Sequence, residues 1–219
     1  MFPNIRPSRL QKGSDLINIT RAASAFPPRL ALALIVVVQT GCDREAPVAQ
    51  PTQAEVAFKP QEMADALHAV IAADREVYSL HLVQRLQTED HVLKSSAKWK
   101  EEKALPLPAQ VLRMGSELVQ RKGAEFHYVL RSLWPINFKN GPETATERAG
   151  LEFVAAHPDT NYYAGESLGG RRYFTAVYPD IALSSACIEC HNQNQNSPKR
   201  DFKIGDVMGG LIVRVPLEF

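Results

Sequence analysis

The residues with the most specific chemistry are Cys187, Cys190 and His191, which lie in the sequence Cys-Ile-Glu-Cys-His. Two thiols three residues apart, followed at once by an imidazole, form the pattern of covalent c-type haem attachment. Each thiol can add across one of two neighbouring vinyl groups on a porphyrin edge, and the adjacent histidine then supplies the proximal nitrogen to the iron. The spacing therefore predicts one covalent haem c, held by Cys187 and Cys190, with His191 as an iron ligand.

Two other chemistries use the same residue types. A zinc ion could bind Cys187, Cys190 and His191, but structural zinc normally takes four protein ligands. The third cysteine of the chain, Cys42, lies far away in the sequence. A redox-active C-x-x-C pair is typical near a βαβ pattern, which the surrounding residues do not show. Haem is the favoured interpretation, with zinc binding and thiol redox chemistry as the alternatives.

The amino-terminal segment is typical of export. Residues 1–41 carry five basic side chains against one carboxylate, and a nine-residue apolar run ends at Val38. This length suits a signal peptide and falls short of the roughly 20 apolar residues that cross a bilayer. The next residues, Gln39-Thr40-Gly41-Cys42, resemble a bacterial lipobox, although Gln39 replaces the usual Leu. We therefore expect residues 1–42 to be a lipoprotein-type signal peptide with Cys42 acylated; an ordinary signal peptide or an uncleaved anchor is the alternative.

A tether and then a globular domain are predicted after the signal peptide. Residues 43–59 contain Pro47 and Pro51 and indicate a flexible tether. A cleaved and acylated protein would be lipid-anchored to the membrane on the periplasmic side of the cell envelope.

The 219 residues have a formal net charge of +1, with 45% hydrophobic and 22% charged residues. Because no part of the domain is strongly basic, we expect no nucleic-acid partner.

A long helix is predicted from Pro60 to about Thr88, because apolar residues recur at spacings of three and four. At 100° per residue His81 falls near the middle of this apolar stripe, whereas His68 falls to the side. A histidine on an apolar face is commonly a core or interface residue; the sharper hypothesis is that His81 is the sixth iron ligand. Met114, in a second predicted helix over 110–121, is an alternative thioether ligand.

The second half of the domain has the pattern of an antiparallel sheet. Aromatic and β-branched residues predict strands, and Gly169-Gly170 predicts a hairpin turn. A helix with Thr144 or Thr146 as its cap interrupts the strands. The predicted elements are a strand over 126–133, an irregular loop over 134–142, a helix over 147–156 and strands over 171–178 and 211–217. The fold class is therefore α+β, with helices first and then an antiparallel sheet crossed by a helix.

Several segments in one order resemble the Tll0287-like family of haem domains, over roughly residues 60–219. The resemblance rests on these stretches of sequence: Leu107-Pro108-Ala109-Gln110, Ser132-Leu133-Trp134-Pro135-Ile136-Asn137, Glu147-Arg148-Ala149-Gly150-Leu151, Tyr173-Phe174-Thr175-Ala176-Val177-Tyr178-Pro179-Asp180, Ala186-Cys187-Ile188-Glu189-Cys190-His191-Asn192 and Gly205-Asp206-Val207-Met208-Gly209-Gly210. The family implies a PAS-like antiparallel sheet with flanking helices and a long amino-terminal helix, carrying one c-type haem. Its members are secreted proteins or the sensory parts of bacterial signalling proteins.

The resemblance also shapes the functional expectation. No kinase, cyclase or chemotaxis domain follows the haem domain, so we expect a redox or small-ligand sensor or binding module that acts through a redox or signalling partner. A periplasmic monohaem electron carrier is the alternative, and a homodimer is a further expectation. No nucleophile–base pair points to an enzyme.

Family members use Cys or Met, water or a partner subunit as the sixth ligand of the haem iron. With Cys42 acylated, the candidates here are His81, Met114 and His91. Lys199, Arg200 and Lys203 could pair with haem propionates or form a solvated basic loop.

Overall fold

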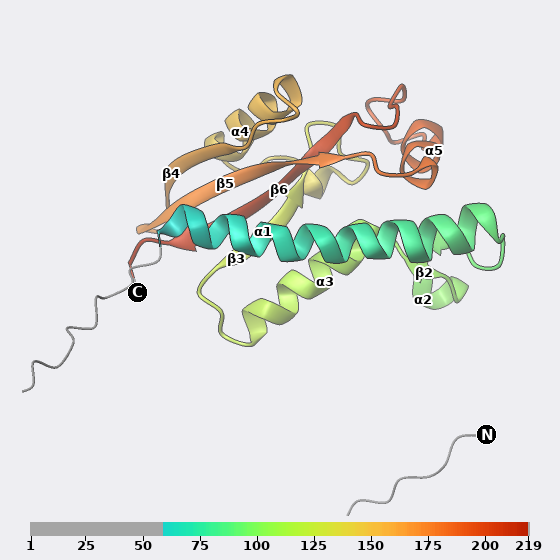
Figure 1. The fold of residues 1–219 in the computed structure, drawn as a ribbon, viewed down its shortest axis with the longest axis horizontal. Coiled ribbons are helices and arrows are strands. Elements are labelled where there is room, and N and C mark those ends of the chain that lie inside the picture. The colour runs from blue at the N-terminus through green and yellow to red at the C-terminus, as the bar shows by residue number, and fades with distance from the viewer. Residues whose placement is uncertain (1–58, 219) are drawn as a thin grey trace, which may run out of the picture. The chain divides into compact units, whose positions relative to one another are not determined.

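The computed structural model describes residues 59–218 (Figure 1). The predicted signal peptide, Cys42 and nearly all of the predicted tether lie outside the described residues. The elements are α1 (Pro60–Val77), the π-helix η1 (Tyr78–Glu89), β1 (Ser95–Ser96), α2 (Trp99–Glu102), β2 (Leu105–Pro106), α3 (Pro108–Arg121), β3 (His127–Arg131), the 3₁₀ turn η2 (Phe138–Asn140), α4 (Ala145–Ala156), β4 (Tyr162–Leu168), β5 (Arg171–Ile181), α5 (Ser185–Gln193) and β6 (Val207–Pro216). Among residues 59–218, none of the helices combines the length and apolarity that a membrane span requires.

The predicted α+β class is confirmed. Four strands form one sheet in the order β3-β6-β5-β4, and every neighbouring pair is antiparallel. The Gly169-Gly170 turn joins β4 to β5, and both glycines have positive φ, which suits a tight hairpin. The long strands β5 and β6 lie at the centre of the sheet and are joined through α5, so the Cys-Ile-Glu-Cys-His sequence is carried on the connection between the two central strands.

Helices cover both faces of the sheet, which explains why the middle of β5 and nearly all of β6 are buried. Alternate side chains point to opposite faces. One face packs against α1 and α3, the other against α4 (Figure 1). The first core contains Ala64, Leu112, Tyr128, Ala176, Tyr178, Leu211, Val213 and Val215. The second contains Leu151, Val154, Val177 and Ile212.

A buried ion-pair network lies under α4. Thr144 caps this helix by accepting a hydrogen bond from the Glu147 backbone N–H at 3.0 Å, which selects one of the two predicted caps. The Glu147 carboxylate then accepts a hydrogen bond from Arg214 on β6 at 2.8 Å, and Arg214 also bonds Glu166 on β4 at 2.8 Å. Because these charges are almost fully buried, their mutual pairing is what makes their burial tolerable.

The long amino-terminal helix is confirmed, but the side of its second half that is buried was predicted incorrectly. From Tyr78 onward its hydrogen bonds follow the wider π pattern, i→i+5, so a wheel drawn at 100° per residue no longer identifies the buried side. Ser79 and Val83 are buried, whereas Val77 and Leu82, two of the apolar residues whose spacing predicted the helix, are exposed. His68, expected at the side, instead stacks on the buried ring of Tyr178 at 3.8 Å between centroids.

Candidate cofactor site

Helix α5 places both thiols and the imidazole on one stretch of helix surface. Cys187, Cys190 and His191 stand at positions i, i+3 and i+4, which are neighbours on an α-helix. Both thiols are free; Cys187 is half-buried and Cys190 is exposed. The Cys187 sulfur lies 3.3 Å from the hydroxyl of Ser184, just before the helix. The arrangement presents two thiols on one turn of helix, as attachment to two neighbouring vinyl groups requires.

The geometry disfavours the alternatives of zinc binding and thiol redox chemistry. Within residues 59–218, no group of three or more His, Cys, Asp or Glu side chains is arranged to hold a metal ion. Redox-active C-x-x-C cysteines usually have a lowered pKa, because the thiolate is the reactive form. Here desolvation, and then the neighbouring Cys187, raise the pKa of Cys190. A raised pKa keeps Cys190 in its protonated form, which does not favour disulfide exchange.

His191 is prepared for metal ligation by its surroundings. The ring is half-buried and lies edge-on to Phe202, with 5.8 Å between centroids. Its Nδ1 atom is fully buried and has no hydrogen-bond partner. Burial lowers the pKa of His191; Asp180 opposes this shift and Arg75 adds to it. The imidazole is therefore neutral near pH 7, which is the form that binds metals. With Nδ1 enclosed by protein, Nε2 is the ring nitrogen that remains available to a ligand.

An ion pair between α1 and the end of β5 lies next to the thiols and the imidazole. Arg75 donates two hydrogen bonds to Asp180, Nε to Oδ1 at 2.7 Å and the second nitrogen to Oδ2 at 2.8 Å. Burial disfavours the charge of Arg75, but Asp180 outweighs it and raises the pKa of Arg75. Arg75 and Asp180 both act on the pKa of His191, and Cys187 acts on the pKa of Arg75. The pair fixes the position of the chain five residues before α5 begins.

The π-helix η1 holds the start of α5. Gln84 Oε1 accepts hydrogen bonds from the Ser185 hydroxyl at 3.1 Å and the Ala186 backbone N–H at 3.3 Å. Ala186 is in the first turn of α5, where backbone N–H groups have no partner within the helix. Gln84 therefore performs the capping role that the Ser184 side chain does not. A π-helix often marks a functional segment, and here it positions the helix that carries the thiols.

The other side of α5 rests on the loop that follows it. The Asn192 amide holds Phe202 by two backbone hydrogen bonds, of 2.9 and 3.0 Å. Buried Phe202 packs with Ala182 and Met208, and Trp134, Cys187 and Ile188 pack against this cluster. These side chains give α5 a rigid apolar support. Such a shell, together with a neutral histidine and adjacent free thiols, fits a covalently bound haem.

The three candidates for the sixth ligand lie on different segments of the chain: His81 on η1, His91 in the loop after it and Met114 on α3. His81 is exposed on η1, so the expectation that it lies at the centre of a buried stripe is wrong. The change to π geometry between α1 and η1 turns it away from the face that carries Ser79 and Val83. His91 is also exposed, and its ring lies 3.1 Å from the backbone oxygen of Gln87. Met114 is half-buried on α3.

Two of the three basic residues after the motif, Lys199 and Arg200, have protein partners for their side chains. Lys199 pairs with Asp201 at 2.6 Å and lies over the ring of Phe202, 5.0 Å from its centroid. Arg200 donates to the backbone oxygen of Asn192 at 2.9 Å. Lys203 is exposed. Lys199 and Arg200 thus brace the loop against α5, and Lys203 is the freest of the three to meet an acidic group.

Sequence reasoning missed the residues that position α5. Arg75 and Gln84 belong to no recognised motif, and the stretch that ends at Asp180 gives no sign of its partner; these contacts span 101 to 105 residues. Arg75 is one of many polar residues in the predicted helix, and its position in the sequence does not distinguish it from the others. Asn192, which holds Phe202, would have been the easiest of these positioning residues to find from the sequence, because it directly follows His191.

The comparisons with known proteins agree with the expected family. The sequence profile of the Tll0287-like family matches residues 53–216. The solved structure described as the cyanobacterial heme-protein Tll0287 is 17% identical to this chain, with a TM-score of 0.45, and the match covers 73% of this chain and 98% of that one. No curated protein sequence matches. Since the profile spans most of the chain, this protein belongs to the Tll0287-like family.

Proposed function

We propose that this protein binds one haem covalently through Cys187 and Cys190, with His191 as the proximal ligand. The observation that carries the proposal is the arrangement on α5, where two free thiols adjoin a neutral imidazole whose Nδ1 is enclosed. The solved structure titled as a heme-protein bears the name of the family to which this chain belongs, and this family membership supports the same cofactor. A bound haem would supply an iron centre for electron exchange or small-ligand binding. The protein supplies the attachment, the proximal nitrogen and the burial.

We further propose that the domain is a redox or small-ligand sensor or binding module rather than an enzyme. The antiparallel sheet covered by helices is the arrangement that a PAS-like sensory domain would use, and the site is tied to the long helix α1–η1 through Arg75 and Gln84. A change at the iron could therefore reach a partner through that helix. The electron-carrier alternative is favoured by the exposure of Cys190, which would leave one haem edge near solvent.

Haem staining after denaturing electrophoresis tests the attachment. Stain should stay on the polypeptide through acid–acetone extraction and should be lost when Cys187 and Cys190 are both replaced by Ala. The matched control is Cys42→Ala, which removes the remaining cysteine and should leave the stain unchanged. Loss of stain from the unaltered protein on extraction would contradict covalent binding.

Optical spectra separate the sensor from the carrier. A ferrous spectrum that changes with CO indicates an iron position open to ligands and favours the sensor. A low-spin spectrum unaffected by CO favours the carrier. In His81→Ala, a change from low spin to high spin that imidazole reverses would support His81 as the sixth ligand; an unchanged low-spin spectrum would move the assignment to Met114 or His91.

We also propose that the domain is exported and lipid-anchored through Cys42. The support is the basic amino terminus, the apolar run and the Gln39-Thr40-Gly41-Cys42 sequence. More than one acyl chain gives a stable anchor, whereas a single chain is marginal. Mass spectrometry of the mature protein should find an acylated Cys42 at the amino terminus. A peptide that reads unmodified through residues 39–42 would exclude it.

A further inference from the structure

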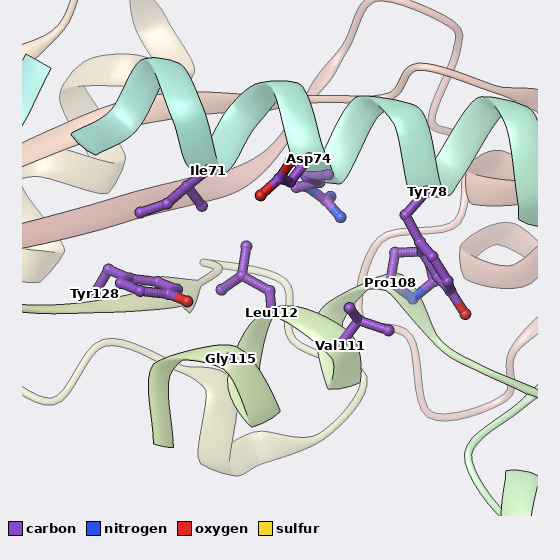
Figure 2. Close-up of a pocket in the computed structure, with 9 residues that line it drawn as sticks. Ile71, Asp74, Tyr78, Pro108, Val111, Leu112, Gly115 and Tyr128 are labelled. Carbon is purple, nitrogen blue, oxygen red and sulfur yellow. The ribbon is translucent and has the colours of Figure 1, made fainter. Parts of the chain in front are cut away.

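Helix α1 carries apolar residues on three sides, and two of these sides are covered. On one side, fully buried Ala64 belongs to the core against the sheet. On the next, Ile71 faces the hollow between α1 and α3, which Leu112 of α3 also lines (Figure 2). The third side faces solvent and carries a row of apolar residues at spacings of three and four, which consists of Met63, Ala66, Val70, Ala73 and Val77.

This apolar row lies on a regular α-helix. All five residues precede the change to π geometry at Tyr78. At 100° per residue they fall within about 80° of one another, on one narrow side of the helix. Val70 is 63% exposed and Val77 is 53% exposed. Ala66 and Ala73 are also exposed, and Met63 is half-buried.

An exposed apolar row is unusual, because the solvent side of a helix in a globular protein normally carries polar and charged residues. Helix α3 follows this rule, since its exposed side includes Arg113, Glu117, Gln120 and Arg121. A contiguous apolar surface of this kind indicates that another element covers it.

The spacing of the row suits a second helix of the same sequence. Alternating steps of three and four residues form the heptad pattern by which two helices interlock their side chains. In an antiparallel pair, Val70 would face the partner's Ala73, and Ala66 would face the partner's Val77. Each larger side chain then meets a small one, and the two-fold symmetry repeats each contact. A parallel pair would set alanine against alanine, which leaves gaps in the packing.

The acidic residues beside the row favour the same orientation. Glu62, Asp74 and Glu76 are exposed on α1. A parallel pair would bring each carboxylate level with its own counterpart, and like charges that face each other across an interface are unfavourable. In the antiparallel register, Asp74 is level with the partner's Ala69 and Glu76 is level with the partner's Leu67. The carboxylates of the two copies are then kept apart.

We propose that two copies of this chain form a dimer through an antiparallel pairing of α1, with the apolar row as its centre. The row also forms one wall of a hollow of about 500 Å³ that reaches Val119 and Phe126, so the apolar surface extends beyond the helix itself. Two heptads bury less than the roughly 800 Å² per partner of a standard complex. We therefore expect a dissociation constant of about 10–100 µM. The pairing uses protein surface alone and does not depend on the proposed haem.

Sedimentation equilibrium of the full-length protein, in a detergent matched in density to the solvent, measures this association. The unaltered protein should change from monomer to dimer between about 1 and 200 µM. Ala73→Glu should weaken the association at least tenfold, because its carboxylate would be buried against the partner's Val70. The matched control is Ala149→Glu, which alters an exposed alanine on α4 and should leave the association unchanged.

Cysteine cross-linking measures the orientation. A mixture of the Ala66→Cys and Val77→Cys proteins should form a disulfide between residues 66 and 77 under mild oxidation, whereas either protein alone should not link through its new thiol. Mass spectrometry of the linked peptides separates this product from disulfides of Cys42, Cys187 and Cys190. In the control, a mixture of Ala149→Cys with Val77→Cys should give no such link.

Four results would overturn the proposal. A monomer throughout the concentration range would leave the row to another cover, such as residues 43–58 of the same chain. An association that Ala73→Glu leaves unchanged would place the interface elsewhere. Absence of the 66–77 link from the mixture, or equal cross-linking by each cysteine variant alone, would exclude the antiparallel pair. The concentration series and the exposed position of Ala73 keep the outcome clear of folding defects.

Discussion

Replacing Asp180 with Asn should destabilise the domain, because it leaves the guanidinium of Arg75 without a counter-charge in a mostly buried position. The two side chains are 16% and 11% exposed. Removing one partner of a fully buried pair costs about 3–5 kcal/mol, since the other charge stays buried and unpaired. Partial contact with solvent reduces this to about 2–3 kcal/mol.

Thermal unfolding measures the effect. For a domain of this size, about 2–3 kcal/mol corresponds to a Tm lower by roughly 5–10 °C. Asp90→Asn is the matched control, because Asp90 pairs with Arg85 at 3.2 Å in a pair whose side chains are 43% and 66% exposed. That exposed pair should contribute no more than about 0.5 kcal/mol.

A double variant separates the cost of an orphaned charge from the value of the contact. Arg75→Met combined with Asp180→Asn removes the orphaned guanidinium, so it should lose less stability than the two single changes added together. The reasoning would be refuted if Asp180→Asn cost no more than Asp90→Asn, because the ion pair would then not hold α1 to the end of β5.

Three further predictions concern the rest of the domain. Burial lowers the pKa of His68 in the fold, so its stabilising contribution is fully present above the unfolded pKa of about 6.5 and is lost as the pH falls below it toward the folded value. His68→Phe should therefore reduce the drop in Tm between pH 7.5 and 5.5, and exposed His157→Phe should not. Gln84→Ala should cost about 1 kcal/mol by removing the cap of α5, and unchanged hydrogen exchange in α5 would exclude that role. Gly150→Ala should cost about 1–3 kcal/mol, because its Cβ would lie 2.5 Å from a valine methyl carbon; the control Gly165→Ala meets no atom within 4 Å, and equal Tm values would contradict the packing.

The parts of the fold that could be predicted are those set by local pattern. β5 and β6 are apolar runs bounded by turns, and the cap of α4 was narrowed to two threonines, Thr144 and Thr146, of which the structure uses Thr144. The spacing of Cys187, Cys190 and His191 likewise identified the candidate haem-attachment motif without any knowledge of the fold.

The remainder depends on features without a local signal. The spacing of the apolar residues does not indicate that the helix changes to π geometry at Tyr78, so a helical wheel could not predict the exposure of His81. The burial of Glu147 depends on Arg214, 67 residues away, and the orientation of α5 depends on Gln84 in a helix formed far earlier in the chain. Such pairings are fixed by the tertiary structure alone.

The dependence of α5 on distant partners has a consequence for the order of events during maturation. Arg75 and Gln84 reach their partners across 105 and 101 residues, and contacts of such long range form late and slowly. In a chain that has just emerged, Cys187 and Cys190 would therefore be accessible, and the covalent attachment proposed above would meet a peptide that can still change its conformation. Once Arg75 meets Asp180, the same segment is clamped between a helix and a sheet. Haem attachment would thus be easiest before the Arg75–Asp180 pair forms, and a variant that folds faster would carry haem on a smaller fraction of its molecules.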